Sequence, residues 1–202
     1  MTTAQTRARQ GKRLSRAFYR RDPRQVAPDL LNKVLVAADG RRARIVETEA
    51  YCGPIDAAAH TYRGRTARNA TMFGQPGLLY VYFTYGMHWC CNAVCGQEGE
   101  GVAVLLRAAE PLAGLELMRA ARPAAKKDRE LCSGPARLCQ AFGIDRTQDG
   151  VDLVASTGGL TIVDDGVPPP DAPVVGQRIG IRHAAEEPWR WYVPGNPNVS
   201  RR

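Results

Sequence analysis

The chain has 202 residues, 44% hydrophobic and 24% charged, which is typical of a globular protein with room for one substantial domain. It has no apolar run of the ~18 residues that a membrane span requires, and its basic N-terminus lacks the apolar stretch of a secretory signal. The formal charge of +8 suits a polyanionic partner, although charge alone does not separate nucleic-acid binding from simple solubility.

The first part of the chain is strongly basic, since the only acid before Arg24 is Asp22. We interpret residues 1–18 as a basic, flexible tail and residues 19–202 as a single domain. The tail would add non-specific phosphate contacts that salt screens. Alternatively, it is a solvated segment without a role.

A short helix at Val26–Asn32 and a hairpin are expected at the start of the domain. The apolar-rich runs Lys33–Ala38 and Arg41–Ala50 flank an Asp-Gly pair at 39–40, which is a strong hairpin signal. A Gly-Pro pair at 53–54 then ends the second strand.

An antiparallel meander is expected next. Residues 55–60 predict a short helical turn, and residues 61–71 form a polar, basic surface loop. Leu78–Thr84, Trp89–Cys95 and Val102–Arg107 follow as strands rich in β-branched and aromatic residues. Glycine-containing turns at 85–86 and 96–101 join these strands.

Helical signals appear only in the second half. Pro111–Arg122 has apolar residues at helical spacing, and the Ser-Gly-Pro sequence at 133–135 is typical of a helix start. Short strands are expected at Leu160–Val163, Val175–Arg182 and Trp189–Val193. Many strands that hairpins can join, with few helices between them, favour an α+β fold over a doubly wound sheet.

The six cysteines, at 52, 90, 91, 95, 132 and 139, include no CxxC pair. We interpret them as reduced, mostly buried residues of a cytosolic protein. A structural zinc site is not expected.

Glu49 is a candidate general base. Strand alternation places it on one face with Ile45 and Glu47, and Ala50 and Tyr51 follow it in sequence. Partial burial would raise the pKa of such a carboxylate and suit it to take a proton from water. The alternative is a solvated strand glutamate or one paired with an arginine.

Tyr51, His60 and Tyr82 could present flat faces to a ring. Aromatic faces bind a purine by stacking, and a positively charged purine binds them better through cation–π attraction. The alternative is that these residues are ordinary aromatics of the core, with His60 a structural histidine.

Tyr85 stands beside a glycine at a hairpin bend. A large aromatic there suits a wedge that fills the space left by an extruded nucleotide. The alternative is a turn tyrosine packed on the sheet. Asn92 can both donate to and accept from a base edge, and Arg107 can hold a phosphate bidentately. Either residue is alternatively a surface or structural polar group.

Several segments together resemble one family. The sequences RIVETEAYCGP, MFGQPGLLYVYFTYGMHWCCN, GVAVLLRAAEP, KDRELCSGPARLCQAFGI and WYVPGNPNVS are similar to those of the alkyladenine (3-methyladenine) DNA glycosylases, also called methylpurine-DNA glycosylases. The resemblance covers roughly residues 18–200. It implies a single α+β domain with a curved antiparallel sheet, a protruding hairpin and flanking helices. One departure is His88, where some relatives have an aromatic such as tyrosine.

The resemblance also implies roles for individual residues. Glu49 would activate the water that attacks C1′, and Arg107 would help to position that water or a phosphate. Tyr85 would intercalate in the minor groove. Asn92 would discriminate against normal guanine by crowding its exocyclic amine. The base pocket, in which Tyr51 and Tyr82 stack on the base, would consist of Tyr51, Ala58, His60, Tyr82, Asn92 and Leu105.

The resemblance therefore implies a monofunctional DNA glycosylase of base excision repair. It would flip alkylated or deaminated purines (3-methyladenine, 7-methylguanine, hypoxanthine, ethenoadenine) out of duplex DNA, hydrolyse the N-glycosidic bond and leave an abasic site. We expect a monomer without metal or organic cofactor, nucleoid-associated in a bacterial cytoplasm or nuclear in a eukaryote. Two alternatives remain open: a non-catalytic DNA-damage binder of the same fold, and, more distantly, an RNA-binding β-domain.

Overall fold

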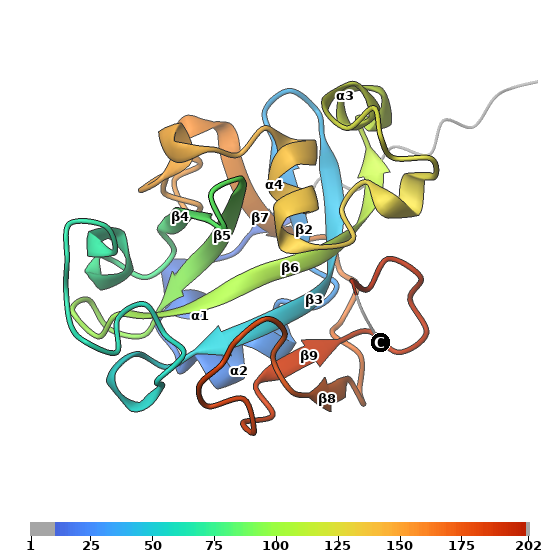
Figure 1. Ribbon diagram of the computed structural model, residues 1–202. Helices are drawn as coiled ribbons and strands as arrows, with labels where there is room; N and C mark the ends of the chain where they lie inside the picture. The colour runs from blue at the N-terminus through green and yellow to red at the C-terminus, as the bar shows by residue number, and fades with distance from the viewer. Residues whose placement is uncertain (1–10, 201–202) are drawn as a thin grey trace, which may run out of the picture.

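Within residues 11–200, the part that the computed structural model describes, nine strands form one curved antiparallel sheet (Figure 1). The strand order is β1-β7-β2-β3-β6-β5-β4, with β9 also on β3 and β8 on β9. The strands are β1 (Lys12–Arg13), β2 (Val34–Ala37), β3 (Arg42–Tyr51), β4 (Leu79–Thr84), β5 (His88–Cys95), β6 (Val102–Ala113), β7 (Leu160–Asp164), β8 (Val174–Gly176) and β9 (Arg190–Tyr192). The helices are α1 (Arg16–Tyr19), α2 (Pro23–Asp29), α3 (Leu115–Ala121) and α4 (Pro135–Phe142).

The long strands β3 and β6 form the centre of the sheet. They pair from Arg42 opposite Ala113 to Tyr51 opposite Ala103. The register shifts on either side of Glu47, so that Arg107 lies in a bulge of β6. Bulges change the direction of a side chain and are common next to active sites.

Helices α2 and α4 cover the two faces of these strands (Figure 1). On the α2 face, the Thr48 hydroxyl donates to the carbonyl of Ala27 at 2.9 Å. On the other face, α4 begins at Pro135 and ends at Phe142, and Gly143, whose φ of 66° suits glycine, caps it. Leu138 and Phe142 of α4 are buried in the main core cluster. The structure thus confirms the α+β class, the meander and the early hairpin.

Two sequence predictions of element type are wrong in part. Pro111–Arg122 is not one helix: β6 continues to Ala113 because β3 offers a partner that far, and α3 starts only after Gly114, whose φ is 71°. Val175–Arg182 is not one strand: β8 ends at Gly176, and an irregular segment follows.

Of two smaller predictions, one shifts along the chain. The helix expected at Val26–Asn32 runs instead over Pro23–Asp29, because Asp22 caps it and proline at the first position favours a start. The turn expected at 55–60 is present, with the Ala59 N–H donating to the Asp56 carbonyl at 2.9 Å, and a 3₁₀ turn at Gly53–Ile55 precedes it.

Part of the segment predicted as a tail belongs to the fold. Lys12 and Arg13 form β1 against β7, and Arg16 at the start of α1 is paired with Asp152. The rest of that prediction, residues 1–10, lies outside the described residues.

The six cysteines are buried and free, as predicted. No helix in residues 11–200 is long and apolar enough to cross a membrane.

Candidate active site

The register of four strands brings three of the predicted site residues, together with Tyr80, into one row. Glu49 on β3 lies opposite Leu105 on β6, which in turn lies opposite Asn92 on β5. Asn92 lies opposite Tyr80 on β4. Directly paired residues of antiparallel strands point to the same face, so these four side chains share a face. Alternation along β3 adds Tyr51.

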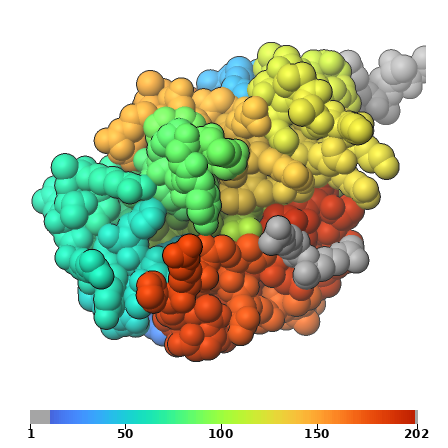
Figure 2. Space-filling view, in the orientation of Figure 1, coloured from blue at the N-terminus to red at the C-terminus, as the bar shows by residue number. Residues whose placement is uncertain are grey.

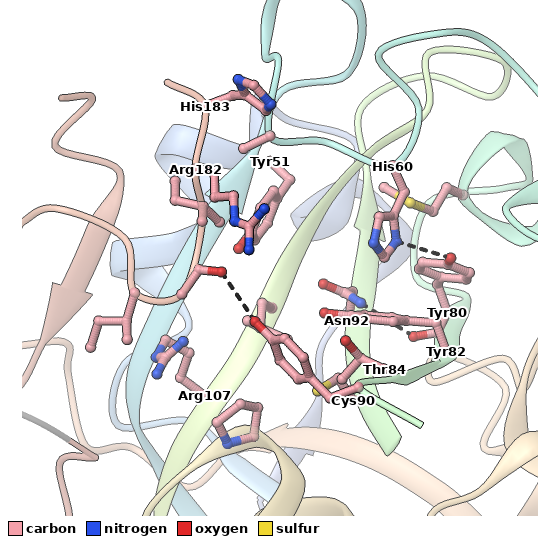
Figure 3. A pocket seen from close by; sticks show the side chains of 18 of the residues that line it. Tyr51, His60, Tyr80, Tyr82, Thr84, Cys90, Asn92, Arg107, Arg182 and His183 are labelled. Atoms are coloured by element: carbon pink, nitrogen blue, oxygen red, sulfur yellow. Dashed lines mark hydrogen bonds between the residues drawn. The ribbon is translucent and has the colours of Figure 1, made fainter. Parts of the chain in front are cut away.

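A pocket of about 440 Å³ opens on this face. Figure 2 shows the hollow where the loop after β3, the β4–β5 hairpin and the segment before β9 meet. In Figure 3, Tyr51 lies on one side, and His60, Tyr80 and Tyr82 lie on the other. Every predicted site residue except Glu49 lines the pocket: Tyr51, Ala58, His60, Tyr82, Tyr85, Asn92, Leu105 and Arg107.

Glu49 is fully buried directly behind this lining. Its carboxylate accepts hydrogen bonds from the Tyr51 hydroxyl at 2.9 Å and the Ile179 N–H at 2.8 Å, and its Oε1 lies 3.2 Å from Nη1 of Arg107. All three partners line the pocket. Burial raises the pKa of Glu49, although Arg107 and the two hydrogen bonds oppose the rise.

Arg107 connects Glu49 to a second buried carboxylate. Its Nε donates to Oε1 of Glu47 at 3.0 Å. Burial disfavours the charge on Arg107, but the two carboxylates outweigh it and raise its pKa. The guanidinium therefore stays charged beside the pocket.

The opposite wall is aromatic. The His60 Nδ1 and the Tyr80 hydroxyl are 3.2 Å apart. A dashed line in Figure 3 marks this contact. The rings of Tyr80 and Tyr82 are stacked with centroids 5.5 Å apart, and His60 meets Tyr82 edge-on at 4.5 Å. Burial and nearby Arg68 lower the pKa of His60, so its ring is neutral at pH 7.

Tyr85 projects at the tip of the β4–β5 hairpin with 75% of its surface exposed. Its φ of 52° lies in the left-handed region, which is strained for a bulky side chain. Its hydroxyl donates to the carbonyl of Gly180 at 3.3 Å and so joins the hairpin to the segment before β9. Tyr85 is thus an exposed ring held in a strained conformation at the rim of the pocket.

The segment Ile179–His183 lines the pocket, and sequence reasoning missed it because its alternating apolar residues suggested a strand. It is anchored by Arg178, whose guanidinium donates to both oxygens of Asp56, at 2.6 and 2.8 Å. The same guanidinium lies 4.8 Å from the centroid of the Tyr51 ring. Tyr80 was also missed, although its alternation with Tyr82 predicts a shared face.

The site thus combines a buried carboxylate, a guanidinium that lines the pocket, and aromatic walls. Within residues 11–200, no group of three or more His, Cys, Asp or Glu side chains is placed to hold a metal ion.

Residues 17–197 match the family described as methylpurine-DNA glycosylase (MPG). Similar proteins carry the name "Putative 3-methyladenine DNA glycosylase", and three of them are described next. The chain is 65% identical to the one from Burkholderia lata over 94% of this chain and 92% of the relative. Identity is 50% for Streptomyces avermitilis (93% and 90% covered) and 49% for Methanocella arvoryzae (94% and 96%). The chain belongs to the methylpurine-DNA glycosylase family.

Proposed function

We propose that the protein is a monofunctional DNA glycosylase that releases alkylated or deaminated purines from duplex DNA and leaves an abasic site. The observation that carries this proposal is the buried Glu49 carboxylate, held by Tyr51 and Arg107 directly behind an aromatic pocket. At about 440 Å³, the pocket has room for one everted nucleobase.

In the proposed reaction, the oxygen of a water molecule bonds to C1′ while the bond from C1′ to the purine nitrogen breaks. The electrons of that bond leave with the purine, and Glu49 takes the proton of the water. The sugar passes through an oxocarbenium-like state, which the ionised carboxylate and the DNA phosphates stabilise. A purine methylated at N3 or N7 already carries positive charge, so it leaves without further protonation.

The pocket would select the base in three ways. Tyr51 and Tyr82 would stack on it, with a cation–π gain for a charged lesion. His60, which is neutral, could donate to or accept from the base edge. Asn92, on the pocket floor beside Leu105, would crowd the exocyclic amine of normal guanine.

The direct test is release of free base. Duplexes with one hypoxanthine or one 7-methylguanine should give free base and an alkali-labile abasic site, while an unmodified duplex should give neither. The strand should remain uncut before alkali treatment. Damage-specific binding without release would favour the non-catalytic binder, and the absence of both would contradict the proposal.

Replacing the hairpin tyrosine should slow base release from duplex DNA. For Tyr85→Ser we expect a decrease of about 10- to 100-fold, because the ring would offset an unstacking cost of a few kcal/mol. The deficit should shrink when the lesion lies in an unpaired strand. Tyr62→Ser, at a second exposed tyrosine that lies outside the pocket lining, is the matched control. Unchanged turnover on duplex DNA would exclude the wedge role.

The acid limb of the pH–rate profile, where the rate falls as the pH drops, should reflect the burial of Glu49. The base works only when ionised, and burial raises its pKa, so activity should fall as the pH drops through a range above that of an exposed glutamate. Single-turnover rates on 7-methylguanine duplex measure this limb, since the charge of that lesion is permanent. A rate that stays constant down to the range of an ordinary carboxyl group would argue against Glu49 as the base.

A further inference from the structure

Glu47 is a second buried carboxylate that the proposed reaction does not use. It is fully buried and accepts hydrogen bonds from Nε of Arg107 at 3.0 Å and from Nε of Arg190 at 2.7 Å. Ser200 donates to it twice, through its N–H at 2.7 Å and its hydroxyl at 3.0 Å. A buried carboxylate with several donors fixes the position of each of them.

Arg107 is held on three sides by this arrangement. Its Nε contacts Glu47, its Nη1 lies 3.2 Å from Glu49, and its Nη2 lies 3.2 Å from the hydroxyl of Ser200. The bulge of β6 directs the side chain toward both carboxylates. Because a guanidinium is planar and rigid, fixing Nε and Nη2 also sets the direction of Nη1.

Hydrogen bonds hold the segment after β9 in a position where Ser200 contacts Glu47 and Arg107. The Val193 N–H donates to the Val46 carbonyl at 3.0 Å, and Asn196 donates to Glu110 at 3.1 Å. Asn198 is buried and donates to the Asn196 side chain. In Figure 1 this segment follows β9 and ends beside the central strands. Its contacts place it on β3 and β6, the strands that carry Glu49 and Arg107.

We propose that Glu47 and Ser200 are positioning residues that hold Arg107 against Glu49, so that the C-terminal segment completes the active site. This inference rests on the proposed function. Neither residue would touch the base or the reacting atoms. Their effect would pass through Arg107. Its guanidinium orients the Glu49 carboxylate and balances the negative charge of that carboxylate.

The test separates chemistry from binding. Ser200→Ala should lower the single-turnover rate of base release from 7-methylguanine duplex on the order of ten-fold, because small displacements of a catalytic group are costly. Affinity for the same duplex should stay within about two-fold, because in this proposal Ser200 does not contact DNA. Ser200→Thr, which keeps the hydroxyl, should recover most of the rate. Ser15→Ala, which removes an exposed hydroxyl that caps α1, should leave the rate unchanged.

Glu47→Gln supplies a second readout that a purely structural role would not produce. Removing the negative charge of Glu47 lowers the pKa of Glu49, since Glu47 raises it in the native protein. The acid limb of the rate should therefore move to lower pH, together with a loss of maximal rate. If Glu47→Gln fails to fold, the comparison of Ser200→Ala with Ser200→Thr tests the proposal by itself.

The outcomes are distinct. An active wild type with an unaffected Ser200→Ala, or a Ser200→Thr no faster than Ser200→Ala, would overturn this inference alone. A decrease seen only in DNA affinity would also overturn it. A wild type that releases no base from any damaged duplex would overturn the proposed function and this inference with it.

Discussion

Glu49→Gln should lower the rate of base release by about 10²–10⁴-fold, the usual contribution of one positioned general base. The amide keeps the size of the side chain and can still accept from the Tyr51 hydroxyl or the Ile179 N–H. It cannot take a proton from water or balance the charge of Arg107. Affinity for damaged duplex should remain near that of the wild type, because the aromatic walls and Tyr85 are unchanged. Single-turnover rates and equilibrium binding to the same lesion duplex measure the two effects separately.

The matched control for this substitution is Glu98→Gln, at an exposed glutamate in the turn before β6. It makes the same chemical change away from the pocket, so its rate should equal that of the wild type. Base release retained in Glu49→Gln, with normal folding in a thermal melt, would reject the assignment of Glu49 as the base.

Asp56→Asn should lower the melting temperature by about 6–20 °C. Its ion pair with Arg178 is closed to solvent, with both side chains at 0% exposure. Removing one partner of such a pair costs about 3–5 kcal/mol because the other charge stays buried without compensation. In a domain of this size, each kcal/mol corresponds to roughly 2–4 °C. The loss should also slow base release, because Arg178 anchors the segment whose Ile179 N–H contacts Glu49.

Asp128→Asn is the matched control for burial. The Asp128 carboxylate also takes two hydrogen bonds from one guanidinium, that of Arg119, at 2.9 and 2.7 Å. Both side chains are close to half exposed, at 47% and 45%, so water replaces the lost contacts. Its melting temperature should change little. Equal changes in melting temperature in the two variants would show that burial of the Asp56–Arg178 pair does not increase its contribution to stability.

The sequence by itself determined which residues could share a face within each strand. The alternation of Glu47, Glu49 and Tyr51 along β3, and of Tyr80 and Tyr82 along β4, is local and follows from the period of a strand. The turns between the strands were equally visible, because glycine is favoured where the backbone needs positive φ. These features, with the motifs of the family, were enough for the fold class and for the part of the pocket lining that comes from the strands β3 to β6 and the loop after β3.

The ends of elements were less predictable, because partners elsewhere in the chain decide them. Pro111 lies within β6, a position that sequence patterns assign to a helix start. Proline is tolerated there because β5 pairs with β6 only as far as Leu105, which leaves one side of β6 free at Pro111. The length of β3, not the local sequence, sets how far β6 extends.

Only the tertiary structure decided how the site is supported. The pairing of Arg178 with Asp56 joins residues 122 positions apart, and that of Ser200 with Glu47 joins residues 153 apart. No periodicity connects such residues, since each contact depends on how the loops return to the sheet. Strand register likewise placed Glu49, Leu105 and Asn92 in one row, and a bulge turned Arg107 toward the carboxylates. The local pattern thus specified which groups were available, whereas long-range packing fixed their mutual distances and their burial.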